Sequence, residues 1–157
     1  MADPPPFKIE FYEDENGRKP ALQWITNDLT PRQRRIIGLA MNEILQHEGI
    51  DVCDGEWGKP LGDGLHEFRV RHGESEILSR SRSPRTVRRR QAGLLSRLKS
   101  VKENVLLRVF FHQDGDTLII ILGGYNKGRF PSKRREQEEI KCARARLDKW
   151  RKRRRQS

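Results

Sequence analysis

NVLLRVFFHQDGDTLIIILGGYNKGRF, residues 104–130, contains two strongly apolar runs that meet at an Asp-Gly pair. An Asp-Gly pair between two strand-like runs is a strong signal for a β-hairpin. The second run, residues 118–122, is as continuously apolar as a central strand. The chain leaves this hairpin through Tyr125, Lys127 and Arg129, which we expect to be exposed. The segment therefore predicts a rigid hairpin that presents aromatic and cationic side chains at its end, an arrangement suited to a phosphate backbone.

The residues before the hairpin predict two strands and two helices. Apolar and polar residues alternate over residues 7–11, and apolar residues mark residues 65–70, which is typical of half-buried strands. Helical spacing after Pro20 and after Thr30-Pro31 predicts a helical hairpin that ends at about residue 49. Residues 51–64 are rich in Gly and Asp and are expected to form a loop.

The residues after the hairpin predict one more helix. Gly123 and Gly124 are expected to break the second strand of the hairpin, and Pro131 and Ser132 open the helix. Its apolar residues recur at steps of three and four, the spacing of a stripe that docks on a sheet: Ile140, Ala143, Leu147 and Trp150. The whole order predicts one α+β domain over residues 1–157, with a small antiparallel or mixed twisted sheet, an N-terminal helical hairpin and a C-terminal helix.

Basic residues are concentrated in two segments of this chain, whose formal net charge is +11. Residues 80–100 contain eight basic and no acidic residues, and residues 127–157 contain fourteen basic and four acidic ones. We interpret residues 75–102 as a basic insertion between strands and residues 151–157 as a basic tail. Such a distribution favours an anionic polymer as partner, and solvated segments without a binding role are the alternative.

Several classes of function are disfavoured by what the sequence lacks. Cys53 and Cys142 stand alone, which is typical of reduced thiols in a cytosolic protein. No spacing of ligand residues predicts a metal site, and no motif predicts a cofactor. The N-terminal residues have no secretory signal pattern, and no run is long enough to cross a bilayer. We therefore expect a soluble cytoplasmic protein with no membrane partner.

Four parts of the chain together resemble the RelE/ParE toxin superfamily, and most closely its HigB-like, phage-derived branch. They are the predicted helical hairpin and the blocks KPLGDGLHEFRV, LLRVFFHQDGDTLIIILGGYNKG and EIKCARARL. The resemblance covers roughly residues 7–73 and 103–150, and no single motif in it is as specific as a metal-ligand set. It implies a RelE-like fold.

The same resemblance implies a toxin of a type II toxin–antitoxin pair that cleaves mRNA on the ribosome without a metal. The implied partners are an antitoxin of helix-turn-helix type, the ribosome and mRNA. Two alternatives remain open: a ParE-like inhibitor of DNA gyrase that cleaves nothing, and a catalytically silent nucleic-acid-binding or phage interaction protein.

Cleavage of RNA without a metal needs a base for the 2′-hydroxyl proton, cations for the charged transition state and an acid for the leaving oxygen. The resemblance assigns this work to Arg69 and Arg108, and the exit of the hairpin adds Tyr125 and Lys127. Clustered cations are expected to bring the pKa of Lys127 or Tyr125 closer to neutrality. Further contacts with RNA are expected from four basic residues: Arg71, Arg129, Lys133 and Arg134.

Each candidate also has a structural interpretation. Arg69 and Arg108 can form salt bridges to Glu67, and Tyr125 can be a packing residue at the rim of the site. Lys127 matches the first lysine of the family's double-lysine segment, whereas Gly128 stands at the second. The acid and the base are therefore unassigned, and the basic insertion leaves open whether the active face is accessible.

Overall fold

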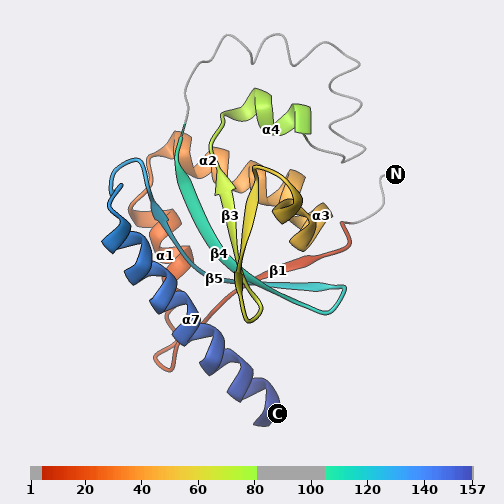
Figure 1. Ribbon diagram of the computed structural model, residues 1–157, viewed down its shortest axis with the longest axis vertical. Helices are drawn as coiled ribbons and strands as arrows, with labels where there is room; N and C mark the ends of the chain where they lie inside the picture. The colour runs from red at the N-terminus through yellow and green to blue at the C-terminus, as the bar shows by residue number, and fades with distance from the viewer. Residues whose placement is uncertain (1–4, 81–104, 157) are drawn as a thin grey trace.

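The computed structural model describes residues 5–80 and 105–156 and has an α+β architecture built on one mixed sheet. Its strands stand in the order β1-β5-β4-β3-β2 (Figure 1). The strand bounds are β1 (Lys8–Phe11), β2 (Gly58–Gly62), β3 (Leu65–Val70), β4 (Leu107–Asp114) and β5 (Leu118–Asn126). β1 runs parallel to β5, and the other neighbouring strands are antiparallel.

The predicted hairpin forms the centre of the sheet. β4 and β5 pair from Asp114 and Leu118 at the turn to Leu107 and Asn126 at the open end. Gly115 has a φ of 64° in the turn, a conformation that glycine adopts without steric cost. β5 does not end at its two glycines as expected, but continues through them to Asn126.

The strand β2 was not predicted, because its residues were assigned to a loop. Gly58–Gly62 has the sequence KPLG after its first glycine and shows no apolar alternation. β2 pairs only with β3, so it is an edge strand, where a proline such as Pro60 is tolerated. Its turn into β3 passes through Gly62, Asp63 and Gly64, all with positive φ.

The N-terminal helical hairpin covers one face of the sheet. α1 (Pro20–Asn27) is followed by α2 (Pro31–Ala40), which continues through a π-helical segment, η1 (Met41–Leu45), into α3 (Gln46–Glu48) and a 3₁₀ helix, η2 (Gly49–Asp54). Thr30 caps α2 through a reciprocal capping box with Gln33. Ile36, Ile37 and Ile44 are fully buried against this face, which confirms the predicted apolar spacing.

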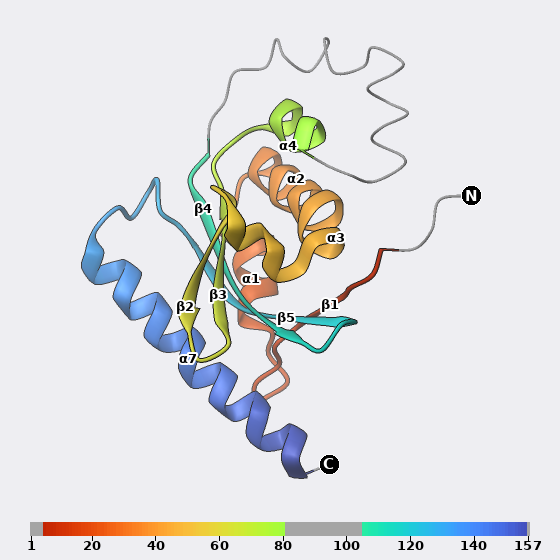
Figure 2. The ribbon, with the colours of Figure 1, turned by 45° about the vertical axis from the view of Figure 1, so that its right-hand side comes forward.

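The C-terminal helix α7 (Lys133–Gln156) lies on the opposite face of the sheet (Figure 2). Ala143 and Leu147 are fully buried there, and Ile140 and Trp150 are partly buried beside them, as the stripe predicts. The helix does not stop before the basic residues. It continues to Gln156, so residues 151–156 are helical rather than a separate tail.

The segment predicted as a basic insertion begins as part of the packed domain. Residues 74–80 form α4 (Glu74–Arg80), in which Ile77 and Leu78 are buried. Arg80 also pairs with Glu48 at 2.5 Å. Residues 75–80 therefore belong to the domain because they contribute apolar surface to its core. The rest of the predicted insertion, residues 81–102, lies outside the described residues.

Within the described ranges, 5–80 and 105–156, no helix combines the length and the apolar character that crossing a membrane requires.

Candidate functional site

Three of the predicted site residues lie side by side across neighbouring strands. Arg69 of β3 pairs in register with Arg108 of β4, and Arg108 pairs with Tyr125 of β5. Because side chains directly opposite one another in a sheet point to the same face, the three side chains form one row. Tyr125 packs with residues of α7, so the row lies on the α7 face.

Glu67 is the acidic partner of both arginines in this row. One of its carboxylate oxygens, Oε1, accepts a hydrogen bond from Arg69 Nε at 2.7 Å and lies 3.6 Å from Arg108 Nε. Glu67 is fully buried, and its second oxygen, Oε2, has no hydrogen-bond partner among the described residues. Both salt bridges that the sequence offered as structural alternatives are therefore formed.

Arg108 is buried, with 2% of its surface exposed. Burial lowers the pKa of Arg108 below its ordinary value, and the nearby guanidinium groups of Arg69 and Arg71 add to that effect, whereas Glu67 opposes it. An arginine remains charged at neutral pH in a protein. The row therefore contains a buried positive charge that depends on Glu67 for compensation.

Tyr125 is less exposed and less acidic than the sequence predicts. Only 1% of its surface is exposed, and its hydroxyl has no hydrogen-bond partner among the described residues. The pKa of Tyr125 is raised to about 12. Burial is the largest cause; the nearby carboxylates of Glu136 and Glu67 also raise the pKa, whereas Arg108 lowers it. The pKa of Tyr125 therefore moves away from neutrality rather than closer to it, because loss of hydration outweighs the neighbouring cation.

The other predicted cations lie after β3 and between β5 and the first turn of α7. The backbone N–H of Lys127 donates to Leu106, and its ammonium lies 3.9 Å from Glu136 of α7. Arg71 is partly exposed directly beyond β3, close enough to Arg108 to affect its pKa. Arg129 is exposed in the connection to α7, and Lys133 and Arg134 are exposed in the first turn of that helix.

The sequence prediction missed Glu136, which brings a carboxylate to the row. Glu136 lies on α7, is partly exposed, and is the charged residue with the largest effect on the pKa of Tyr125. The sequence contained a signal for Glu136. Position 136 lies four residues before Ile140, which lies three before Ala143, so Glu136 continues the spacing of the apolar stripe. The prediction also missed Phe130, on whose ring Arg135 stacks, with 4.2 Å between the guanidinium carbon and the ring centroid.

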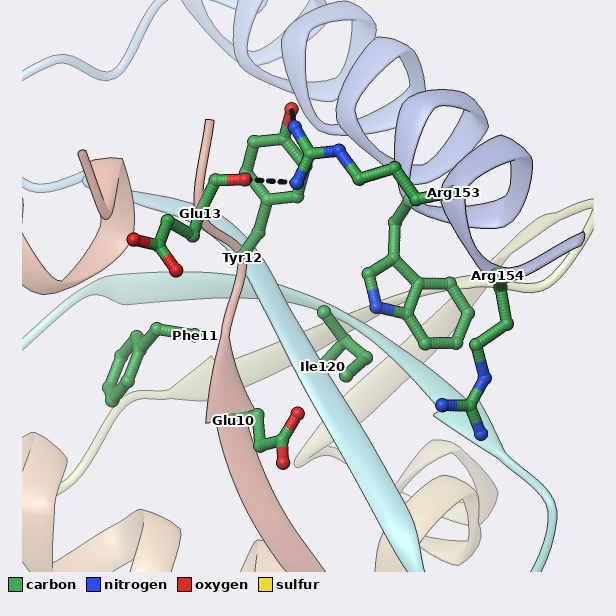
Figure 3. Close-up of a pocket in the computed structure, with 8 residues that line it drawn as sticks. Glu10, Phe11, Tyr12, Glu13, Ile120, Arg153 and Arg154 are labelled. Atoms are coloured by element: carbon green, nitrogen blue, oxygen red, sulfur yellow. Dashed lines mark hydrogen bonds between the residues drawn. The ribbon is translucent and has the colours of Figure 1, made fainter. Parts of the chain in front are cut away.

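At its C-terminal end, α7 uses its arginines to bind the opposite end of the sheet. Arg153 donates to the backbone carbonyl of Glu13 and to the hydroxyl of Tyr12, whose ring it covers (Figure 3). Arg154 donates to Asp114 at the β4–β5 turn, 2.8 Å away. Tyr12, Glu13, Arg153 and Arg154 border a pocket of about 340 Å³, which Glu10 also lines (Figure 3). Arg153 and Arg154 of the predicted basic tail thus make contacts within the folded domain.

In the described part of the chain, no group of three or more His, Cys, Asp or Glu side chains is arranged to hold a metal ion. Cys53 is partly buried, and burial raises the pKa of its thiol to about 11, which makes it a weak nucleophile. The chemistry of the row therefore rests on guanidinium, ammonium, carboxylate and phenol groups.

Comparison of the chain with family models, with curated proteins and with solved structures found no match in any of the three.

Proposed function

We propose that this protein is a toxin that resembles the RelE/HigB group and cleaves mRNA on the ribosome in the cytoplasm. The observation that carries the proposal is the row of Arg69, Arg108 and Tyr125 across β3, β4 and β5, with Lys127 and Glu136 at its open end. This arrangement concentrates cations where a phosphate of a single strand can approach, and it adds one carboxylate capable of accepting a proton.

The exposure of each side chain indicates which role it can have in cleavage. Arg108 is too buried to touch RNA, so it acts as a positioning residue that holds Glu67 and, through it, Arg69. Arg69 keeps about a fifth of its side chain exposed. Together with Arg71, it supplies guanidinium groups for the non-bridging oxygens of the phosphate.

The proton transfers are assigned to Glu136 and Lys127. The Glu136 carboxylate takes the proton of the 2′-hydroxyl, and the 2′-oxygen then attacks the phosphorus. The bond from phosphorus to the 5′-oxygen breaks, and the Lys127 ammonium gives its proton to that leaving oxygen. The products are a 2′,3′-cyclic phosphate and a 5′-hydroxyl end. Tyr125, neutral and buried, shapes the row and takes no part in proton transfer.

Expression of the chain under an inducible promoter, followed by mapping of mRNA 5′ ends, tests this proposal. We expect new 5′-hydroxyl ends within translated messages, at positions that follow the reading frame. Glu136→Gln removes the proposed base and should lower cleavage by a factor of about 10² to 10⁴. Glu138→Gln is the matched control, because Glu138 is exposed on the same helix and pairs only with Arg134 among the described residues.

Two outcomes would contradict the nuclease. If induction produces no new ends, the chain does not cleave mRNA. If growth nevertheless stops, inhibition of a protein target such as gyrase becomes the better account. A neighbouring reading frame that encodes a small helix-turn-helix protein would support the antitoxin part of the proposal.

A specific observation favours one alternative, a nucleic-acid-binding protein without catalysis. Arg108 and Tyr125 are 2% and 1% exposed, and Glu67 is fully buried, so three members of the candidate site cannot reach a substrate as they stand. In that case the partly exposed Lys127 and the exposed Arg129 would bind RNA, whereas Glu136→Gln would change nothing.

A further inference from the structure

A second hollow lies at the end of the sheet, where the exit of β5 meets α1 and the start of α7. Its volume is about 230 Å³. It is lined by two aromatic, two basic, one acidic and one amide side chain: Trp24, Phe130, Arg129, Arg135, Asp28 and Asn126. Asn126 directly follows Tyr125 in β5, so its side chain points to the opposite face of the sheet, and the hollow lies across the end of β5 from the proposed cleavage site, beside Lys127 in the chain. Pockets for drug-sized ligands span roughly 300–1,000 Å³, so this one suits a single ring system.

The aromatic ring and the guanidinium groups in the hollow are held in place by contacts with neighbouring side chains. Phe130 is 37% exposed, and the guanidinium groups of Arg135 and Arg129 lie 4.2 Å and 5.3 Å from its ring centroid. Arg135 is fixed in turn by Glu139, 2.8 Å from its Nε. Such exposed aromatic and guanidinium planes are what single-stranded RNA bases stack on.

Trp24 reaches the hollow only because position 124 has no side chain. A Cβ placed on Gly124 would lie 2.4 Å from Cζ3 of Trp24. The indole therefore rests directly on the backbone of β5 and is partly exposed. Its place against the strand gives the hollow a rigid aromatic wall.

The polar groups in the hollow favour one base over the others. Asp28 ends α1 with an exposed carboxylate, which can accept two parallel hydrogen bonds. Guanine supplies two adjacent N–H donors on its Watson–Crick edge, whereas the other bases supply one. Asn126 accepts a hydrogen bond from the backbone N–H of Arg129 through Oδ1, at 3.2 Å. The NH₂ of the same amide is a donor suited to the guanine carbonyl oxygen.

We infer that this pocket takes up an unpaired guanine of single-stranded RNA, stacked among Trp24, Phe130 and the two guanidinium groups and read by Asp28. The inference rests on the proposed function, since it supplies the base preference of the same RNA site. Asp28 and the aromatic residues would thus determine specificity, whereas Lys127 and Arg71 bind phosphate without regard to sequence.

Fluorescence anisotropy with short single-stranded RNA oligonucleotides tests the inference directly. The oligonucleotides differ only in one central base, which is guanine, inosine or adenine. We expect the guanine oligonucleotide to bind about tenfold more tightly than the adenine one, as for a good bidentate contact. Inosine lacks the 2-amino group and should bind with intermediate affinity.

Variants separate base recognition from phosphate binding. Asp28→Asn should abolish the preference for guanine and leave the affinity for the adenine oligonucleotide unchanged. Lys127→Ala should weaken binding of every oligonucleotide equally and lower the salt dependence by about one unit of slope. Arg35→Ala, an exposed arginine on α2 that does not line the hollow, is the control and should change neither.

Equal affinity for guanine and adenine oligonucleotides, or a preference that survives Asp28→Asn, would overturn the inference. This result is independent of mRNA cleavage. A preference for guanine without new mRNA ends would support the guanine pocket and contradict the nuclease activity. New mRNA ends without any base preference would support the nuclease activity and contradict the guanine pocket.

Discussion

At the scale of single residues, Glu67 determines how the row is held together. Its carboxylate compensates Arg69 and Arg108 at once, yet one of its oxygens has no hydrogen-bond partner among the described residues. Buried ion pairs of this kind add little net stability, but removal of one partner leaves an uncompensated charge. Arg69 and Arg108 therefore depend on Glu67 for charge compensation more than exposed arginines depend on their acidic partners.

We predict that Glu67→Gln lowers the free energy of unfolding by about 3–5 kcal/mol. The neutral amide cannot balance the guanidinium of Arg108, which stays buried. Urea unfolding followed by circular dichroism measures the change. In the exposed control, Glu138→Gln, the loss should be below about 1 kcal/mol. An equal, small effect of both substitutions would contradict the role of Glu67 as the compensating charge.

The raised pKa of Tyr125 predicts a loss of stability at high pH. Its folded pKa is about 12, above the ordinary value of 10.0. Below pH 10 the phenol is neutral in the folded and the unfolded chain, and its contribution is fully present. As the pH rises from 10 to 12, only the unfolded chain releases this proton, so the folded state loses about 2–3 kcal/mol.

Comparison with Tyr125→Phe isolates this effect from the titration of lysines. The variant should lose less stability than the wild type between pH 10 and pH 12 in urea unfolding. Tyr125→Phe should also be tolerated at neutral pH, because the hydroxyl has no partner to lose among the described residues. Parallel losses in both proteins would show that Tyr125 titrates normally.

At the scale of elements, the two glycines of β5 have packing roles that the sequence did not reveal. Gly123 accommodates Arg146, which donates to the carbonyl of Leu122 at 2.8 Å, and Gly124 accommodates Trp24. Glycine within a strand often marks such a close approach. We had expected the pair to end the strand, because that is the usual effect of two glycines in isolation.

We predict opposite effects for two glycine-to-alanine substitutions. In Gly124→Ala the new Cβ would lie 2.4 Å from Trp24 and 2.9 Å from the carbonyl oxygen of Arg108, so stability should fall by about 1–3 kcal/mol. In Gly38→Ala the new Cβ would meet no atom of another described part of the chain within 4 Å, and alanine favours the helical backbone of α2, so stability should rise by about 0.5–1 kcal/mol. Thermal unfolding of both variants measures the two shifts. Equal shifts of the same sign would contradict the packing of Trp24 on β5.

At the scale of the whole molecule, α7 connects the two ends of the sheet. Lys127 pairs with Glu136 near its start, and Arg153 and Arg154 bind Glu13 and Asp114 near its end. Apolar residues of the helix pack with Tyr125 of the row, while its basic residues pair with acidic residues at turns, Asp63 and Asp114. The positive charge of the C-terminal segment consequently has a structural use as well as any role in binding RNA.

The sequence by itself determined the α+β class, the central hairpin and the buried stripe of α7. These features depend on local periodicity and on the Asp114-Gly115 turn, which a linear pattern records. It also placed Arg69, Arg108, Tyr125 and Lys127 in one region. Only the tertiary structure decided which of them are accessible, that β2 pairs with β3, and that Glu136 and Phe130 adjoin the site. Burial and pairing depend on which distant segment covers a side chain, and that depends on packing between elements far apart in the chain.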